Sequence, residues 1–327
     1  MGGRFTSLEI GAGVGGQALG LERAGFDPVV VIDNDPHPCR TLRANRPGWN
    51  VLEMDFKDFV GADYRISTVD LLSGGVPSTP YSIAGKQEGT RDERDLLTAA
   101  VYLAIELQPR AILLETTPSL LSPKFVKVRE EVEAELKHLD YSWEWNVLDA
   151  QNFGVPQTRR SCLVVAMRPD DFARFEWPSP TQQAGATVGE VLRDSMASKG
   201  WPFADAWALL ANRIAPTIVG GSKNHGGADL GPTRTKRQWM ELAVNAHSLG
   251  DDVPGEDFFF DPDLGRDGVP KLTVEQVMKL QGLPDDWIVT GGKTARYKQV
   301  AQAFPPPLAE AVGHRIVAAL TPPASVR

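Results

Sequence analysis

A glycine-rich segment near the start of the chain has the composition of a ligand-binding turn. It runs Leu8-Glu9-Ile10-Gly11-Ala12-Gly13-Val14-Gly15-Gly16 and follows a short apolar stretch. Glycines allow backbone amides and a helix N-terminus to approach a polar ligand closely. Because no Gly-Lys-Ser/Thr sequence ends the segment, the pattern of a nucleotide phosphate loop is excluded.

Acidic residues follow the next two apolar stretches. Asp33 precedes Asn34 after one stretch, and Asp55 precedes Phe56 after the other. A carboxylate at the end of a second strand can accept hydrogen bonds from both ribose hydroxyls, and one at the end of a third can accept from an adenine amino group. The turn and the two acids together predict a site for an adenosyl ligand. The alternative is that the acids cap helices or turns.

The first half of the chain alternates between apolar strands and helices. The periodicity predicts strands over 5–10, 28–32, 49–53, 69–72 and 111–114, and helices over 17–24, 38–45 and 96–107. This alternation is typical of a mostly parallel sheet with helices on both faces. The expected fold class is therefore α/β.

The composition of the sequence changes near Asp170. Proline and glycine become frequent, as in Trp177-Pro178-Ser179-Pro180 and Val219-Gly220-Gly221-Ser222, so loops should dominate there. We expect a smaller second domain or a large insertion. Helices over 273–281 and 307–320 predict that the C-terminal segment packs back on the first domain.

Composition limits the partners and the location. The 327 residues carry a formal net charge of −8, so any nucleic-acid site should be local rather than spread over the surface. The best local candidate is the basic stretch Lys223 to Arg237, and a solvated face is the alternative. No apolar run approaches the ~18 residues of a membrane span, and the first residues lack the features of a leader. We expect a cytoplasmic protein, associated with the nucleoid if it binds DNA.

The chain has two cysteines, Cys39 and Cys162. They are too few for a disulfide framework or a four-ligand zinc site, and no metal site is predicted. Both are expected to be small buried residues.

Six blocks of the sequence resemble, in order, those of the DNA cytosine-5 methyltransferase family. They are Leu8 to Phe26, Gly74 to Asp95, Leu113 to Glu115, Phe153 to Arg159, Leu272 to Trp287, and Gln299 to Pro307. The resemblance covers nearly the whole chain. It implies a Rossmann-like sheet that binds S-adenosyl-L-methionine or S-adenosyl-L-homocysteine, with double-stranded DNA as the partner. It also implies a methyltransferase domain over 1–177, a smaller loop-rich target-recognition domain over 178–268, and a C-terminal segment over 269–327.

The resemblance assigns residues to three roles. The catalytic positions are Ser78, Glu115, Gln157 and Arg159. The cofactor positions are Ile10, Gly11, Ala12, Gly13, Gly15, Gly16, Asp33, Asn34, Asp55, Phe56, Gly75, Pro77 and Gln302. The DNA-facing positions are Lys86, Arg94, Lys223, His225, Arg234, Lys236 and Arg237, which makes the basic stretch a DNA-facing loop.

The family's chemistry is covalent. A cysteine thiolate adds to C6 of a flipped-out cytosine, a glutamic acid protonates N3, and C5 then attacks the sulfonium methyl group. The resemblance gives Glu115 the N3 role, places Arg159 near the base and makes Gln157 a supporting residue. Ser78 stands at the cysteine position, and its hydroxyl is far less acidic than a thiol. No histidine lies in the matched catalytic blocks to activate it.

Other departures from the family pattern fall around the target base. Glu-Asn-Val becomes Glu115-Thr116-Thr117, the second arginine of Gln-x-Arg-x-Arg becomes Ser161, and Gly-Asn becomes Ala301-Gln302. The glycine position raises the question of an unusual backbone angle. The cofactor residues, by contrast, fit the pattern.

This asymmetry leads to three hypotheses. The preferred one is a pseudoenzyme that binds the cofactor and DNA without efficient methylation, with a partner protein or an active methyltransferase subunit as a possible associate. The second is an active cytosine-5 methyltransferase, either native or a Cys-to-Ser trapped variant. The third is a diverged methyltransferase that acts on a non-DNA substrate.

Overall fold

The structure is a computed structural model that describes residues 5–76, 96–181, 185–220 and 227–322. It divides into two compact units. Unit 1 comprises Met1–Leu148, Arg160–Ser179 and Leu308–Arg327, and unit 2 comprises Asp149–Arg159 and Pro180–Pro307. These limits differ from the predicted domain boundaries, because residues 269–307 group with the segment predicted to recognise DNA. The functions given to the predicted domains remain predictions.

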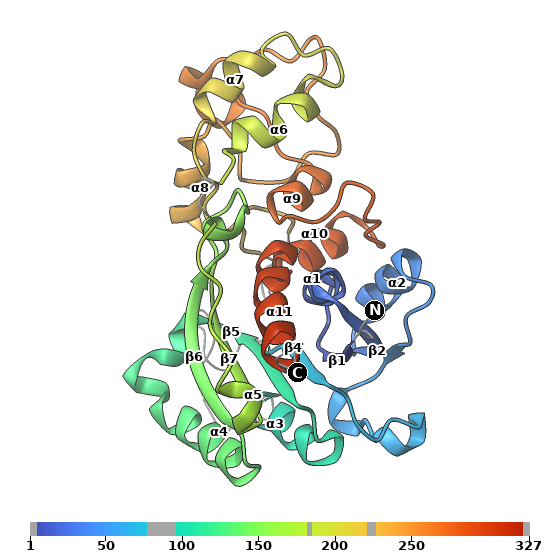
Figure 1. The fold of residues 1–327 in the computed structure, drawn as a ribbon. Coiled ribbons are helices and arrows are strands. Elements are labelled where there is room, and N and C mark those ends of the chain that lie inside the picture. Colours follow the sequence, from blue (N-terminus) through green and yellow to red (C-terminus); the bar gives the residue numbers. More distant parts are fainter. Residues whose placement is uncertain (1–4, 77–95, 182–184, 221–226, 323–327) are drawn as a thin grey trace, which may run out of the picture. The chain divides into compact units, whose positions relative to one another are not determined.

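Within its described residues, unit 1 is built on a seven-stranded sheet with the order β3-β2-β1-β4-β5-β7-β6 (Figure 1). The neighbours from β3 to β5 are parallel, and β7 is antiparallel to β5. The strands are β1 (Phe5–Ile10), β2 (Phe26–Asp33), β3 (Val51–Glu53), β4 (Leu71–Gly75), β5 (Ala111–Thr116), β6 (Ser142–Asp149) and β7 (Arg160–Met167). The predicted strands of the first half and the α/β class are confirmed, whereas β6 and β7 were not predicted.

Helices cover both faces of this sheet. The helices of unit 1 are α1 (Gly16–Ala24), α2 (Pro36–Asn45), α3 (Leu96–Leu107), α4 (Val126–His138), α5 (Pro169–Phe172) and, from Leu308 onward, α11 (Pro306–Leu320). Alternate strand residues such as Leu8, Ile10 and Ile32 join α3 and α4 in one core cluster. Val31 faces the other way and packs with Leu42 of α2. The period-two pattern of the strands thus produces two buried faces.

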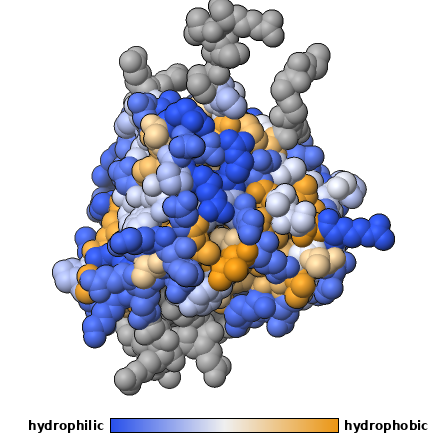
Figure 2. Space-filling view, turned by 60° about the horizontal axis from the view of Figure 1, so that its bottom comes forward, coloured by the Kyte–Doolittle hydropathy of each residue, from blue (hydrophilic) through white to orange (hydrophobic). Residues whose placement is uncertain are grey.

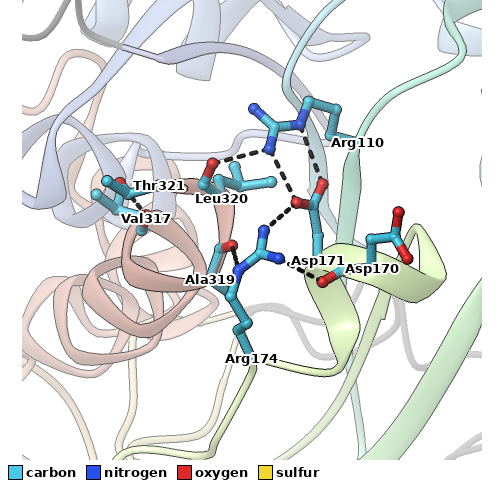
Figure 3. A network of polar contacts seen from close by, with 8 residues as sticks. All are labelled: Arg110, Asp170, Asp171, Arg174, Val317, Ala319, Leu320 and Thr321. Carbon is cyan, nitrogen blue, oxygen red and sulfur yellow. Dashed lines mark hydrogen bonds and ion pairs between the residues drawn. The ribbon is translucent and has the colours of Figure 1, made fainter. Parts of the chain in front are cut away.

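A polar network fastens α5 and the end of α11 within unit 1 (Figure 3). The Asp171 carboxylate accepts two hydrogen bonds from Arg110, at 2.9 and 3.0 Å, and one from Arg174 at 2.6 Å. The same two guanidinium groups donate to the carbonyl oxygens of Leu320 and Ala319. The last carbonyl groups of a helix lack hydrogen-bond partners within the helix. The two arginines supply these hydrogen bonds at the C-terminus of α11.

Unit 2 contains shorter helices joined by loops. They are α6 (Val188–Ala197), α7 (Ala204–Leu210), α8 (Thr233–Met240), α9 (Val274–Leu280) and α10 (Lys293–Ala301). Capping boxes start α6 at Thr187 and α9 at Thr273, because in each the side chains of the N-cap and the third helical residue bond to one another's backbone N–H groups. The predicted helix over 273–281 is confirmed by α9, but the expectation of a loop up to Arg237 is wrong from Thr233 onward.

Both cysteines are free and buried, as predicted. Burial raises the pKa of Cys39 to about 11 and that of Cys162 to about 12. The described residues include no group of side chains that could hold a metal ion, and none of the described helices is long and apolar enough to cross a membrane. The face shown in Figure 2 is largely hydrophilic, with hydrophobic patches between the polar side chains.

Candidate functional site

The glycine turn between β1 and α1 is shaped by left-handed backbone angles. Gly11, Gly13 and Gly15 have φ values of 58°, 54° and 89°. These angles carry a steric cost for residues with a Cβ atom, which explains the glycines at these positions. Gly15 is the N-cap of α1 and provides no capping side chain. The Glu9 carboxylate accepts a hydrogen bond from the backbone of Ala18, in the first turn of the helix.

The turn lies at the place where the strand order reverses. β1 has β2 on one side and β4 on the other, and in open α/β sheets ligands bind at the carboxyl ends of strands at such a switch point. A Cβ atom added to Gly11 would stand 2.7 Å from the carbonyl oxygen of Gly75, at the end of β4. The predicted cofactor residues Gly11 and Gly75 are therefore brought together by close backbone approach.

Asp33, at the end of β2, braces the glycine turn. Its carboxylate accepts hydrogen bonds from the backbone N–H of Gly13 at 2.7 Å and of Asp35 at 2.8 Å. Burial raises the pKa of Asp33 above its usual range, and these two hydrogen bonds oppose that shift. The turn and the β2 acid thus form one structure, as the predicted adenosyl site requires. Its hydrogen bonds to a ribose remain a prediction.

Asp55 and Phe56 follow β3 at the same edge of the sheet. Asp55 caps a short 3-10 helix (Phe56–Asp58), and its carboxylate accepts from the backbone N–H of Lys57. Phe56 is buried, whereas Asn34 after β2 is exposed. The capping role considered for the acids is therefore present at Asp55, and its predicted role toward an adenine amino group stays a prediction.

Two buried polar residues beside the turn were not predicted. Glu9 of β1 and Gln17 of α1 are only 2% and 3% exposed, and Glu9 Oε1 and both polar side-chain atoms of Gln17 lack hydrogen-bond partners within the described residues. Burial raises the pKa of Glu9 to about 8, against the effect of hydrogen bonds from the Ala18 backbone and Ser73. Buried polar atoms of this kind usually pair with a bound ligand or ordered water. In the sequence, the signal for this site was Glu9, an acidic residue within a short apolar strand.

Glu115 lies on β5, next to the strand that leads into the predicted nucleophile block. It is paired in register with Gly75, and its carbonyl oxygen accepts from the backbone N–H of Val76 at 2.8 Å. Unit 1 therefore gathers Gly11, Gly75 and Glu115 at one edge of the sheet. The neighbouring Thr116 is buried, and its hydroxyl makes no hydrogen bond within the described part of the chain.

Gln157 and Arg159 belong to unit 2. Gln157 is fully buried and bonds to Gln281 and to the backbone of Ile218. Arg159 Nη1 donates to the carbonyl oxygens of Ile218 at 3.2 Å and Ala301 at 3.1 Å. The supporting role predicted for Gln157 thus has a structural counterpart, while the catalytic roles of both residues stay predictions.

The Ala301-Gln302 pair lies at the end of α10. Ala301 is the last residue of the helix, and its φ is not positive, so alanine carries no backbone strain there. The question of an unusual angle at this position is answered in the negative. Gln302 is the C-cap of α10 and is exposed, and its predicted cofactor role is untested.

The predicted DNA-facing residues divide into two groups. Arg234, Lys236 and Arg237 lie on α8, where Arg234 and Arg237 are exposed and the Lys236 ammonium lies 3.0 Å from the Asp229 carboxylate. Predicted positions that lie outside the described residues are Pro77, Ser78, Lys86, Arg94, Lys223 and His225.

The strand order, the glycine turn and the acid that braces it are consistent with the fold of the S-adenosylmethionine-dependent methyltransferases. Two solved structures share that fold: a methyltransferase of Entamoeba histolytica, EhMeth, with a TM-score of 0.67 at 12% identity, and the Dnmt2 methyltransferase of S. pombe, with 0.62 at 16%. The matches cover 98% and 97% of this chain, and 100% and 98% of the other chains.

Sequence comparison identifies the family. Residues 5–318 match the C-5 cytosine-specific DNA methylase model, and this chain belongs to that family. It is 49% identical over 317 residues to the Type II methyltransferase M.NaeI of Lentzea aerocolonigenes, covering 96% of this chain and 75% of the relative. It is 45% identical over 320 residues to the Type II methyltransferase M.NgoMIV of Neisseria gonorrhoeae, covering 97% and 98%.

S-adenosylmethionine is the methyl donor of this family. The described residues fit it, because the glycine turn has left-handed backbone angles, the strand-end acids are present, and unpaired polar atoms of Glu9 and Gln17 lie buried beside the turn. When bound, the sulfonium cofactor supplies an activated methyl group. The protein's own contribution on this side is the shaped turn, and the role of Glu115 on β5 stays a prediction.

Proposed function

We propose that this protein binds S-adenosylmethionine and double-stranded DNA, and that its methylation of cytosine C5 is lost or strongly reduced because Ser78 replaces the nucleophile. The observation that supports the proposal is the contrast between two sets of residues. The glycine turn keeps its left-handed angles and its brace from Asp33. The nucleophile position carries a hydroxyl that is a far weaker attacking group than a thiolate.

A second observation from the described residues supports the same proposal. Thr116 stands where the family pattern has asparagine, and its buried hydroxyl has no hydrogen-bond partner in the described structure. A threonine also lacks the amide donors of asparagine. The departure from the family pattern thus includes the strand that carries Glu115, which supports the proposed loss of activity.

The alternative function is an active Type II cytosine-5 methyltransferase. The similarity to M.NaeI and M.NgoMIV over at least 96% of this chain favours it. In that case a general base distant in sequence would activate Ser78. DNA recognition in either case is expected to use the exposed Arg234 and Arg237 of α8.

One pair of measurements separates the two functions. Calorimetry with S-adenosylmethionine should show binding, and transfer of tritiated methyl groups to mixed-sequence duplex DNA should show little or no turnover. Ser78→Cys alone should restore at least part of the transfer if the rest of the site is competent. Ordinary turnover by the wild-type protein would overturn the proposed loss of activity, and absence of cofactor binding would overturn the proposed function as a whole.

DNA binding is tested separately. Affinity for duplex DNA should fall steeply with salt and should depend on sequence, because phosphate contacts supply affinity and base contacts supply specificity. Arg234→Ala with Arg237→Ala should weaken binding. A complete lack of binding at low salt would favour a non-DNA substrate.

A further inference from the structure

A chain of buried side-chain amides crosses unit 2. The backbone N–H of Ile218 donates to Gln157 Oε1 at 2.7 Å, Gln157 Nε2 donates to Gln281 Oε1 at 2.6 Å, and Gln281 Nε2 donates to the carbonyl oxygen of Val300 at 2.8 Å. Both glutamines are 0% exposed. Four separate segments are thereby connected through two side chains: the one around Gln157, residues 215–219, the end of α9 and the end of α10.

The direction of each hydrogen bond in this chain is fixed. An amide has one oxygen that accepts and one nitrogen that donates. Because Ile218 offers an N–H at one end and Val300 offers a carbonyl at the other, both amides must point the same way. A side chain that lacks either group leaves a buried partner unsatisfied, which is costly in a region closed to water.

Arg159 makes a second connection between residues 215–219 and the end of α10. Its Nη1 donates to the carbonyl oxygens of Ile218 and Ala301. Ile218 therefore uses its N–H toward the amide chain and its carbonyl toward Arg159, and Gln281 Nε2 also reaches the Ala301 carbonyl at 3.4 Å. The position of the Arg159 guanidinium thus depends on residues 215–219 and on the end of α10, and the two glutamines fix the positions of both segments.

The segment that receives these bonds leads into the predicted recognition stretch. Residues 215–219 run beside 156–158, with Thr158 N–H donating to Ala215 and Thr217 Oγ1 donating to the Thr158 carbonyl. Tyr297 of α10 donates its hydroxyl hydrogen to the carbonyl of Val219. Farther along the chain lies α8, with the exposed Arg234 and Arg237.

We infer that Gln281 is a positioning residue. Through Gln157 it fixes the positions of Arg159 and of the 215–219 segment relative to one another, and discrimination between DNA sequences depends on it. The inference rests on the proposed DNA-binding function. Gln281 acts through other residues, so its effect should appear in sequence discrimination.

The test uses Gln281→Glu in the full chain, with Gln299→Glu as the matched control. A glutamate at 281 still accepts from Gln157, and once its carboxyl group is ionised it cannot donate to Val300. Because burial raises the pKa of a carboxyl group, the measurements are made at a pH high enough to ionise it. Gln299 is a buried glutamine of α10 that donates to the carbonyls of Thr290 and Ala295. Both variants place a carboxyl group in the same unit and differ in the network that they break.

Hydrogen exchange of the free protein gives the first measurement. In Gln281→Glu, exchange at residues 157–160 and 215–219 should rise about tenfold or more, whereas Gln299→Glu should leave these peptides unchanged. An equal rise in both variants, or none in Gln281→Glu, would overturn the inference. Should Gln281→Glu not fold, Gln281→Asn serves instead, because its shorter amide is unable to span both partners.

Selection from a random-sequence duplex library gives the second measurement. The preference of the wild-type protein for its selected sequence over random duplex should fall about tenfold in Gln281→Glu, with affinity for random duplex nearly unchanged. Unchanged preference would overturn the specificity role. If the wild-type protein selects no sequence at all, the proposed DNA function fails, and hydrogen exchange alone then decides whether Gln281 positions Arg159.

Discussion

The glycine turn of unit 1 and the amide chain of unit 2 both position predicted site residues. The turn depends mainly on backbone conformation, whereas the amide chain depends on side-chain hydrogen bonds. The turn is made by backbone angles at Gly11 and Gly13 and by one carboxylate, that of Asp33, 20 residues from Gly13. The amide chain is made by side chains that lie more than 120 residues apart. The turn should therefore be sensitive to an added methyl group, and the amide chain to a lost polar atom.

Gln157→Leu should have the largest effect on stability. The change leaves the Ile218 N–H and Gln281 Oε1 buried without their partner, so the free energy of unfolding should fall by about 2–5 kcal/mol. Urea unfolding followed by tryptophan fluorescence measures it. Gln238→Leu, at an exposed glutamine of α8, is the control and should change stability by less than about 0.5 kcal/mol. Equal effects would show that burial of the amide chain carries no special cost.

Gly11→Ala breaks the turn instead. The alanine Cβ would meet the Gly75 carbonyl at 2.7 Å, in a backbone conformation with φ of 58°. Strain and displacement together should weaken S-adenosylmethionine binding by about 10- to 100-fold, as calorimetry would show. Gly25→Ala is strained as well, with φ of 111°, but its Cβ has no atom within 4 Å. It should lower the melting temperature without loss of cofactor affinity, and a similar loss there would contradict the steric account.

Asp171→Ala tests whether long-range side-chain networks matter equally in unit 1. Removing this carboxylate leaves Arg110 and Arg174 without their ion pair, although both keep their carbonyl partners on α11. Because the two arginines are partly exposed, the free energy of unfolding should fall by only about 1–2 kcal/mol. Thermal unfolding measures this against Asp170→Ala, an exposed neighbour that should be neutral. Similar melting temperatures for the two variants would exclude the network as a stabilising feature.

The raised pKa of Glu9 predicts that the stability of unit 1 changes gradually with pH. Its pKa is raised from 4.5 to about 8 by burial, so the folded state holds a proton that the unfolded state releases. The contribution of Glu9 to stability is then greatest below about pH 4.5 and is lost as the pH rises toward 8, by up to about 1.4 kcal/mol per pH unit. Denaturant unfolding across this range should show a flatter profile for Glu9→Gln. Identical profiles would mean that Glu9 is ionised in the folded protein.

The sequence predicted best what neighbouring residues determine. The bounds of β1 and α3, the glycine turn and the acid after β2 follow from local periodicity and backbone freedom. The bonding of Gln157 to Gln281 and the antiparallel pairing of β7 with β5 depend on contacts between distant segments, which no local pattern contains. The helical start of α8 at Thr233 was hidden because a dense run of polar residues also suits a loop.

The two buried cysteines make position 78 unusually easy to follow by chemical labelling. With pKa values of about 11 and 12, Cys39 and Cys162 remain protonated at neutral pH, and their burial shields them from alkylating reagents. The sequence has no other cysteine. In the Ser78→Cys protein, an electrophilic dye would therefore report on the introduced thiol against a silent background, and its rate of attachment would measure directly how nucleophilic that site can become.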